Sequence, residues 1–165
     1  MASLLLEQEG IDINIISDYR NETALHFAAQ DDQNNECLAM LLARNTSVNQ
    51  RDSFGGTPLH DAVQYNAVRC VQLLISDERT DPNIKNGEGD SPLMWAVKRN
   101  HVGCVELLVS DTRTNPNIKD GEGDSPLMIA VKRNLVACVE LLLADPRVDL
   151  MTRDNYKRSE EEVAR

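Results

Sequence analysis

Residues 57–63 read TPLHDAV, and three further segments of the chain repeat this pattern in register. The other copies are TALHFAA from Thr23, SPLMWAV from Ser91 and SPLMIAV from Ser125. The copies begin at residues 23, 57, 91 and 125, a constant step of 34. Four copies of one segment at a fixed spacing predict a repeat architecture rather than one globular core.

Each copy reads as two short helices. A hydroxyl residue followed by proline, as in Thr57-Pro58, predicts a helix start, because the hydroxyl caps a free N–H and proline needs no partner there. An asparagine follows each full first helix, and asparagine tolerates the left-handed backbone of a turn. Apolar residues then recur at helical spacing, and residues 83–90, NIKNGEGD, predict a turn or hairpin before the next copy. The turn asparagines are Asn66, Asn100 and Asn134.

One helix pair cannot bury both of its faces, so the pairs are expected to stack into a solenoid. The pattern resembles the ankyrin-repeat family over essentially the whole chain, and TPLHDAV is the best match to that family's T-P-L-H-x-A motif. The resemblance implies an all-α solenoid of stacked helix-turn-helix units with short hairpin loops. We expect one domain over residues 1–165, with a partial repeat at 1–18, full repeats at about 19–52, 53–86, 87–120 and 121–154, and a partial repeat at 155–165.

The chain departs from the family pattern in several places. The period of 34 is one residue longer than the family's. Met94 and Met128 replace the family histidine that is present as His26 and His60, so we expect packing to hold repeats three and four. Asn21 and Lys157 occupy the usual place of a hairpin glycine. At the C-terminal end, either Glu161 belongs to a polar cap or the chain is a piece of a longer protein.

Composition and charge exclude several classes of protein. The net charge of -10 repels phosphate and argues against a nucleic-acid partner. No apolar run approaches the roughly 18 residues of a membrane helix, and MASLLLEQEG lacks the basic start of a secretory signal. We therefore expect a cytoplasmic or nuclear protein that does not insert into membranes, and we expect a monomer.

The residues that could carry chemistry do not form a catalytic or metal pattern. Stacked helices lie about 8–10 Å apart, beyond the roughly 7 Å reach of a disulfide, so the repeated cysteines are interpreted as small apolar side chains. Residues 120–131 alternate acids like a calcium loop, but Ser125 and Val131 replace its required glycine and glutamate. No histidine is paired by motif with a nucleophile. We expect no metal, no cofactor and no enzymatic activity. The cysteines are Cys37, Cys70, Cys104 and Cys138.

The family binds partners on a concave surface made by hairpin tips and first helices. Carried over by motif position, the resemblance implies a surface that gathers most of the chain's few aromatic residues. Trp95, the only tryptophan, is the expected anchor, since aromatic residues dominate interfaces; the alternative is packing against neighbouring repeats. The implied residues are Tyr19, Arg20, Phe27, Ser53, Phe54, Asp61, Gln64, Tyr65, Glu88, Asp90, Trp95, Lys98, Arg99, Glu122, Asp124, Ile129, Lys132 and Arg133.

Charges on this surface are expected to form two ladders. Acidic hairpin tips (Glu88, Asp90, Glu122, Asp124) would take basic side chains of an extended peptide, and basic helix ends (Lys98, Arg99, Lys132, Arg133) would take acidic ones. The alternative is a solvated surface whose charge pairs contribute little.

Together these features predict a non-catalytic scaffold or adaptor that binds another protein or an extended peptide. Two alternatives stay open: a small stoichiometric inhibitor of an enzyme such as a kinase, and a regulatory fragment of a larger multidomain protein.

Overall fold

The computed structural model describes residues 12–33 and 35–150. The predictions for the outermost parts of the two partial repeats, including the hairpin at Lys157 and the cap at Glu161, lie outside these ranges. Within them the chain forms eight helices and no strand, so the predicted all-α solenoid is confirmed.

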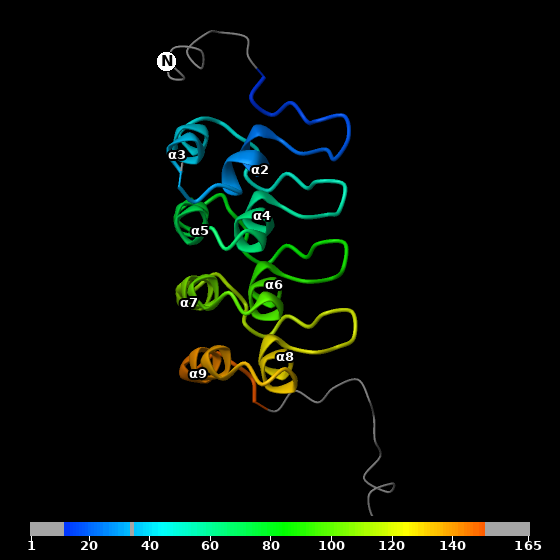
Figure 1. The fold of residues 1–165 in the computed structure, drawn as a ribbon, viewed down its shortest axis with the longest axis vertical. Coiled ribbons are helices and arrows are strands. Elements are labelled where there is room, and N and C mark those ends of the chain that lie inside the picture. The colour runs from blue at the N-terminus through cyan, green and yellow to red at the C-terminus, as the bar shows by residue number, and fades with distance from the viewer. Residues whose placement is uncertain (1–11, 34, 151–165) are drawn as a thin grey trace, which may run out of the picture.

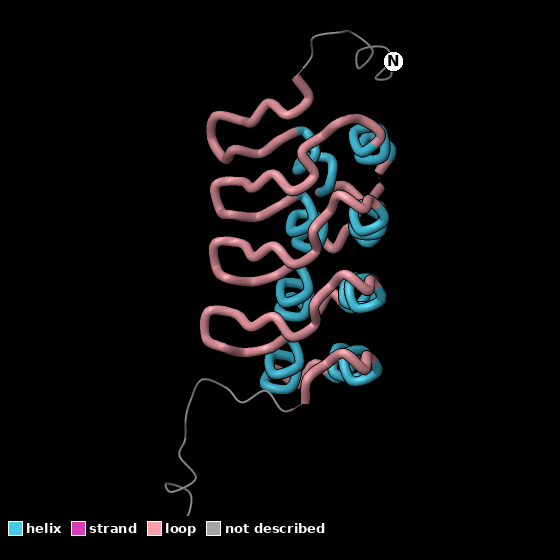
Figure 2. The backbone as a smooth tube through the Cα atoms, turned by 180° about the vertical axis from the view of Figure 1, so that it is seen from behind, coloured by secondary structure: helices cyan, strands magenta, loops and turns pink. Residues whose placement is uncertain are grey.

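The eight described helices form four pairs, which we call repeats one to four. Figure 1 shows the first helices stacked in one row and the second helices in a parallel row, with hairpin loops projecting beyond the first row. Seen from behind in Figure 2, the loops lie one above another. The pairs are α2 (Ala24–Ala29) with α3 (Glu36–Leu42), α4 (Pro58–Gln64) with α5 (Val68–Ser76), α6 (Pro92–Arg99) with α7 (Val102–Ser110), and α8 (Pro126–Lys132) with α9 (Val136–Ala144).

The first helices begin at the predicted hydroxyl residues. The Ser91 side chain accepts a hydrogen bond from the Met94 amide at 3.3 Å, as an N-cap does. In the repeats that carry histidine, the imidazole joins this cap, and the Thr57 amide donates to His60 Nδ1 at 3.2 Å. Proline occupies the first turn of α4, α6 and α8, where no amide partner is needed.

The predicted asparagine turns are confirmed. Asn66, Asn100 and Asn134 have φ of 54°, 55° and 55°, in the left-handed region. The next residue then donates back across the turn, as the Ala67 amide does to the Ala62 carbonyl at 2.8 Å, which closes the helix end.

Each hairpin also needs one left-handed residue. Gly89 provides it with φ of 85°, and Asn21 takes the corresponding place in repeat one with φ of 55°. That first hairpin closes through the Ser17 amide and the Glu22 carbonyl at 2.8 Å. Asparagine thus replaces the usual glycine without loss of the loop.

The core is a thin layer between the two rows. Leu25, Leu59 and Leu93 of the first helices are at most 1% exposed, and second-helix residues such as Leu74 and Leu108 are fully buried. Each helix packs on its counterpart in the next repeat, for example α4 on α6 and α5 on α7. None of the described helices is long and apolar enough to span a bilayer.

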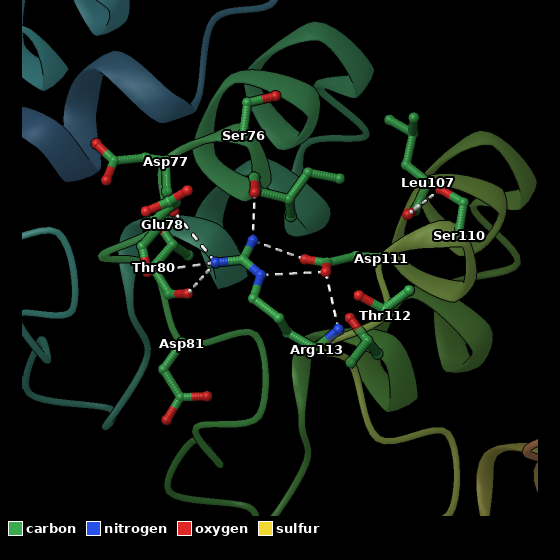
Figure 3. Close-up of polar contacts among 12 residues, drawn as sticks. Ser76, Asp77, Glu78, Thr80, Asp81, Leu107, Ser110, Asp111, Thr112 and Arg113 are labelled. Carbon is green, nitrogen blue, oxygen red and sulfur yellow. Dashed lines mark hydrogen bonds and ion pairs between the residues drawn. The ribbon is translucent and has the colours of Figure 1, made fainter.

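A recurring Asp-x-Arg triplet straps each connector to the repeat before it. The Arg113 guanidinium lies at the C-terminal end of α5, where it donates to the carbonyls of Ile75 and Thr80 (Figure 3). Asp111 holds the guanidinium from the other side at 2.8 Å. Arg113 therefore satisfies carbonyls that a helix end leaves without partners. The three triplets are Asp77–Arg79, Asp111–Arg113 and Asp145–Arg147.

Asparagine amides bridge the same connectors. The Asn83 side chain donates to the Arg113 carbonyl at 2.8 Å and accepts from the Asn115 amide at 2.7 Å. Asn49 and Asn117 make the equivalent pairs of contacts one repeat earlier and one repeat later.

Candidate protein-binding groove

A hollow of about 640 Å³ lies between the hairpins and the first helices of repeats one to three. We call it the groove. Its walls come from hairpin residues such as Phe54 and Glu88, and its floor from α4 and α6. Half of the residues expected from the sequence line it: Arg20, Ser53, Phe54, Asp61, Gln64, Tyr65, Glu88, Trp95 and Arg99.

A smaller hollow of about 270 Å³ extends this surface toward repeat four. Glu88 borders both hollows, so the two form one face of the stack. Four more of the expected residues line the smaller hollow: Lys98, Glu122, Ile129 and Arg133. Ile129 is only 6% exposed and forms its apolar floor.

The aromatic side chains of the groove differ in exposure. Phe54 and Tyr65 are 64% and 56% exposed. Trp95 is half-buried, and its Nε1 donates to Gln64 Oε1 at 3.0 Å. The tryptophan therefore contacts its neighbouring repeat and also presents a surface to the groove.

Two arginines lie over these rings. The Arg20 guanidinium is 5.6 Å from the Phe54 ring centre, and that of Arg99 is 4.7 Å from the Trp95 ring. Such contacts are cation–π interactions and fix each charge beside its ring. Tyr19 and Phe27 are also exposed, but they do not line either hollow.

The expected acidic ladder is wrong for two of its four members. Asp90 is fully buried and Asp124 is 2% exposed. Lys98 Nζ lies 2.7 Å from Asp90, and Lys132 Nζ lies 2.6 Å from Asp124. These carboxylates stabilise their own repeats and are not presented to a peptide, whereas Glu88 and Glu122 are exposed.

Lys98 also joins repeats three and four. Its Nζ lies 3.2 Å from Asp120, which belongs to the hairpin of repeat four. We expected repeats three and four to be held more by packing, because Met94 and Met128 replace the family histidine. Met94 is fully buried in this packing, and Lys98 adds a polar link between the hairpins of these two repeats.

His60 carries the equivalent link one repeat earlier. Its Nδ1 accepts from the Thr57 amide, which leaves Nε2 to donate to the Asp90 carbonyl at 3.1 Å. Burial lowers the pKa of His60 to about 4, so the ring is neutral at pH 7. Both ring nitrogens are occupied by backbone and cap contacts, and the role of His60 is structural. His26 makes the same cap, but its Nε2 has no hydrogen-bond partner among the described residues.

Asp61 lies half-buried on the floor of the groove. Burial raises the pKa of its carboxyl to about 7, although a hydrogen bond from Gln30 at 3.5 Å opposes the change. Gln30 was missed from the sequence, and so were Asp52 and Asn86 of the groove wall. The repeat spacing could have identified Gln30, because it stands 34 residues before Gln64, which was expected to line the groove.

Cys70, Cys104 and Cys138 lie where a second helix packs against the turn of the preceding repeat. Cys104 Sγ lies 3.5 Å from Asn66 Oδ1, and Cys138 makes the same contact with Asn100. Cys70, Cys104 and Cys138 are buried and free, whereas Cys37 is free and exposed. In the described ranges, no three histidine, cysteine or acidic side chains converge as metal ligands would.

Comparison with known proteins agrees with this architecture. A family model described as ankyrin repeats in three copies matches residues 1–86 and residues 70–154. A probable serine/threonine-protein kinase of Dictyostelium discoideum is 34% identical to this chain over 73 residues, which cover 42% of this chain and 8% of the kinase. This chain thus spans a small part of that relative. Because the family matches cover more than half of the sequence, the chain belongs to the ankyrin-repeat family.

Proposed function

We propose that the protein is a non-catalytic interaction module that binds an extended segment of a partner protein in the groove. The observation that carries the proposal is the gathering of Phe54, Tyr65 and Trp95 on a hollow of about 640 Å³. Binding sites are typically concave and carry a few aromatic anchors with polar groups around them.

The chemistry of the groove supports a peptide as the occupant. Its lining combines aromatic faces, backbone of the hairpins and charged groups of both signs, as protein interfaces do. Together the two hollows run along three first helices, α4, α6 and α8, so an extended chain can cross several repeats. The net charge of -10 disfavours nucleic acid in the same place.

A second candidate function is regulation within a larger protein. The similarity to a small part of a probable kinase favours this candidate over a free-standing kinase inhibitor. In either case the groove is the surface that acts. A location in the cytoplasm or nucleus fits the proposal, because Cys70, Cys104 and Cys138 are buried free thiols, as a reducing compartment maintains them.

Peptide selection on the full 165-residue chain tests this proposal. Random 12-residue peptides would be selected by display, and their affinities measured for the wild type, Phe54→Ala and Gln72→Ala. Phe54 is exposed in the groove, whereas Gln72 is exposed on α5, in the row of second helices. We expect selected peptides to bind Phe54→Ala at least about tenfold more weakly and Gln72→Ala unchanged. The proposal fails if no peptide is enriched, or if the enriched peptides do not distinguish Phe54→Ala from the wild type.

A further inference from the structure

The groove contains one acid at a position that is apolar in every other repeat. Phe27, Asp61, Trp95 and Ile129 follow one another at intervals of 34 and occupy the same place on the four first helices. Three of them are large apolar residues. The remaining one, Asp61, is a carboxylate, which is costly to desolvate, so packing does not explain its presence.

Asp61, like Glu22 and Asp52 of the same groove, forms no ion pair in the part of the chain that the structure describes. The buried carboxylate of Asp90 and that of Asp120, in contrast, lie 2.7 Å and 3.2 Å from Lys98 Nζ. In residues 12–33 and 35–150 no lysine, arginine or histidine forms an ion pair with Asp61. Its side-chain partner is the neutral amide of Gln30, at the long distance of 3.5 Å.

The charges around Asp61 leave the groove acidic. Glu22, Asp52 and Glu88 line it together with Asp61, against the two guanidiniums of Arg20 and Arg99. Both guanidiniums lie over aromatic rings rather than against the Asp61 carboxylate. The lining therefore complements a cation.

An aromatic ring stands beside this acid. Tyr65 is the C-cap residue of α4, and its amide donates to the Asp61 carbonyl at 3.0 Å, so the two residues lie one helical turn apart. Both line the groove, and the Tyr65 ring is 56% exposed. A carboxylate beside an exposed ring suits a long basic side chain, whose stem packs on the ring while its head pairs with the acid.

We propose that Asp61 receives a basic side chain, arginine or lysine, from the extended segment that binds the groove, with Tyr65 contacting its stem. This inference rests on the function proposed above and names the chemistry of the partner. Charge-assisted hydrogen bonds to a shielded carboxylate are the strong ones, so this pair is expected to anchor the segment. The site differs from the acidic ladder expected from the sequence, because the carboxylate belongs to the floor of the groove and not to the hairpin tips.

The raised pKa of Asp61 adds a pH dependence to this binding. A cation binds the ionised carboxylate, so affinity is expected to rise as pH increases through about 7. The charged groups that line the groove with Asp61 are Glu22 and Arg20 of the first hairpin, Asp52 of the second, Glu88 of the third, and Arg99 of α6. Removing Asp61 alone separates its titration from theirs.

Two matched peptide libraries test the proposal on the full chain. They differ only at the central residue, which is arginine in one library and glutamine in the other. Peptides are selected on the wild type and measured on Asp61→Asn, on Phe54→Ala to identify groove binders, and on the control Glu106→Gln. Glu106 is an exposed acid on α7, away from the groove.

We expect groove binders to come mainly from the arginine library and to bind Asp61→Asn about tenfold more weakly, with Glu106→Gln unchanged. Replacing the peptide arginine by glutamine should cost about the same on the wild type and little on Asp61→Asn. For the wild type, affinity at pH 6 should be about tenfold lower than at pH 8, a dependence that Asp61→Asn removes.

Peptides that lose affinity on Phe54→Ala but bind Asp61→Asn as well as the wild type would overturn this inference and leave the proposed function intact. If no peptide from either library responds to Phe54→Ala, the proposed function fails and this inference fails with it.

Discussion

The guanidinium of Arg113 donates a hydrogen bond to the carbonyl of Ile75, 38 residues earlier in the chain, at the C-terminal end of α5. The same group contacts the carbonyls of Asp77, Glu78 and Thr80 in the connector that follows. One side chain thus closes a helix of the preceding repeat and shapes the loop after it (Figure 3). In a solenoid, where repeats contact only their neighbours, such a strap couples one repeat to the next.

Arg113→Lys is therefore expected to destabilise the fold although it keeps the charge. A lysine ammonium cannot reproduce the planar fork that reaches several carbonyls and Asp111 together. We expect a loss of about 1–2 kcal/mol in the free energy of unfolding measured by urea denaturation. Arg79→Lys is the matched comparison, since Arg79 contacts two carbonyls, those of Leu42 and Arg44. Equal losses in the two variants would contradict this account of the strap.

Lys98→Gln is expected to destabilise the fold more than the loss of an exposed surface charge would. Lys98 neutralises Asp90, whose side chain is fully buried, and Asp120 of the next hairpin. Removing one partner of a buried pair leaves an uncompensated charge. We expect a loss on the order of 2 kcal/mol in urea denaturation.

Repeat two has neither of these charges at the corresponding positions. There Gln64 replaces Lys98, and Gly56 replaces Asp90. The double variant Lys98→Gln with Asp90→Asn should recover part of the stability, since the buried charge is removed together with its partner. If the double variant is less stable than Lys98→Gln alone, the buried charge is not the cause of the loss.

The helix pairs, their caps and their asparagine turns could be predicted because each depends on a few adjacent residues. Thr57-Pro58 defines a helix start, and Asn66 a left-handed turn, whatever the rest of the chain does. The ion pair of Asp90 with Lys98 could not be predicted in the same way. Its two members are eight residues apart, and they meet only when the hairpin folds back onto the end of α6. The repeat pattern could not show that these two side chains neutralise each other.

The arginine straps were missed for a related reason. The spacing of Arg79, Arg113 and Arg147 follows the repeat, so their recurrence was visible in the sequence. Their targets were not, because the free carbonyls at the end of α5 lie beside Arg113 only after two repeats have stacked. The same holds for Asp61, whose partial burial depends on neighbouring repeats.

The four thiols are expected to separate into one reactive and three protected groups. Cys37 is exposed, whereas Cys70, Cys104 and Cys138 are fully buried. Burial raises the pKa of Cys70 and Cys104 to about 11 and also raises that of Cys138, which suppresses the reactive thiolate. With Ellman's reagent at pH 8, one thiol per chain should react rapidly and three only after addition of urea. Cys37→Ser should abolish the rapid phase, and a second rapid thiol would contradict the burial described here.

Asp61→Asn is expected to stabilise the protein at pH 8 while it weakens binding in the groove. The pKa of Asp61 is about 7 in the folded chain against 3.8 as the ordinary value, so between these values the native state holds a proton that the unfolded state has lost. Stability is therefore lost as pH rises from about 4 to about 7, and the loss persists above pH 7. Asparagine has no charge to desolvate and escapes this loss. We expect Asp61→Asn to exceed the wild type by about 1–3 kcal/mol at pH 8, with the difference vanishing near pH 4.

Urea denaturation of both proteins at a series of pH values measures this difference. Glu106→Gln again serves as the control, because an exposed acid should change stability by less than about 0.5 kcal/mol at any of these pH values. A residue that lowers stability at neutral pH, at a position where three sister repeats carry apolar side chains, is most simply explained by selection for binding. If Asp61→Asn is less stable than the wild type at pH 8, Asp61 contributes to the fold in another way. The proposed binding of a basic side chain by Asp61 then loses its energetic support.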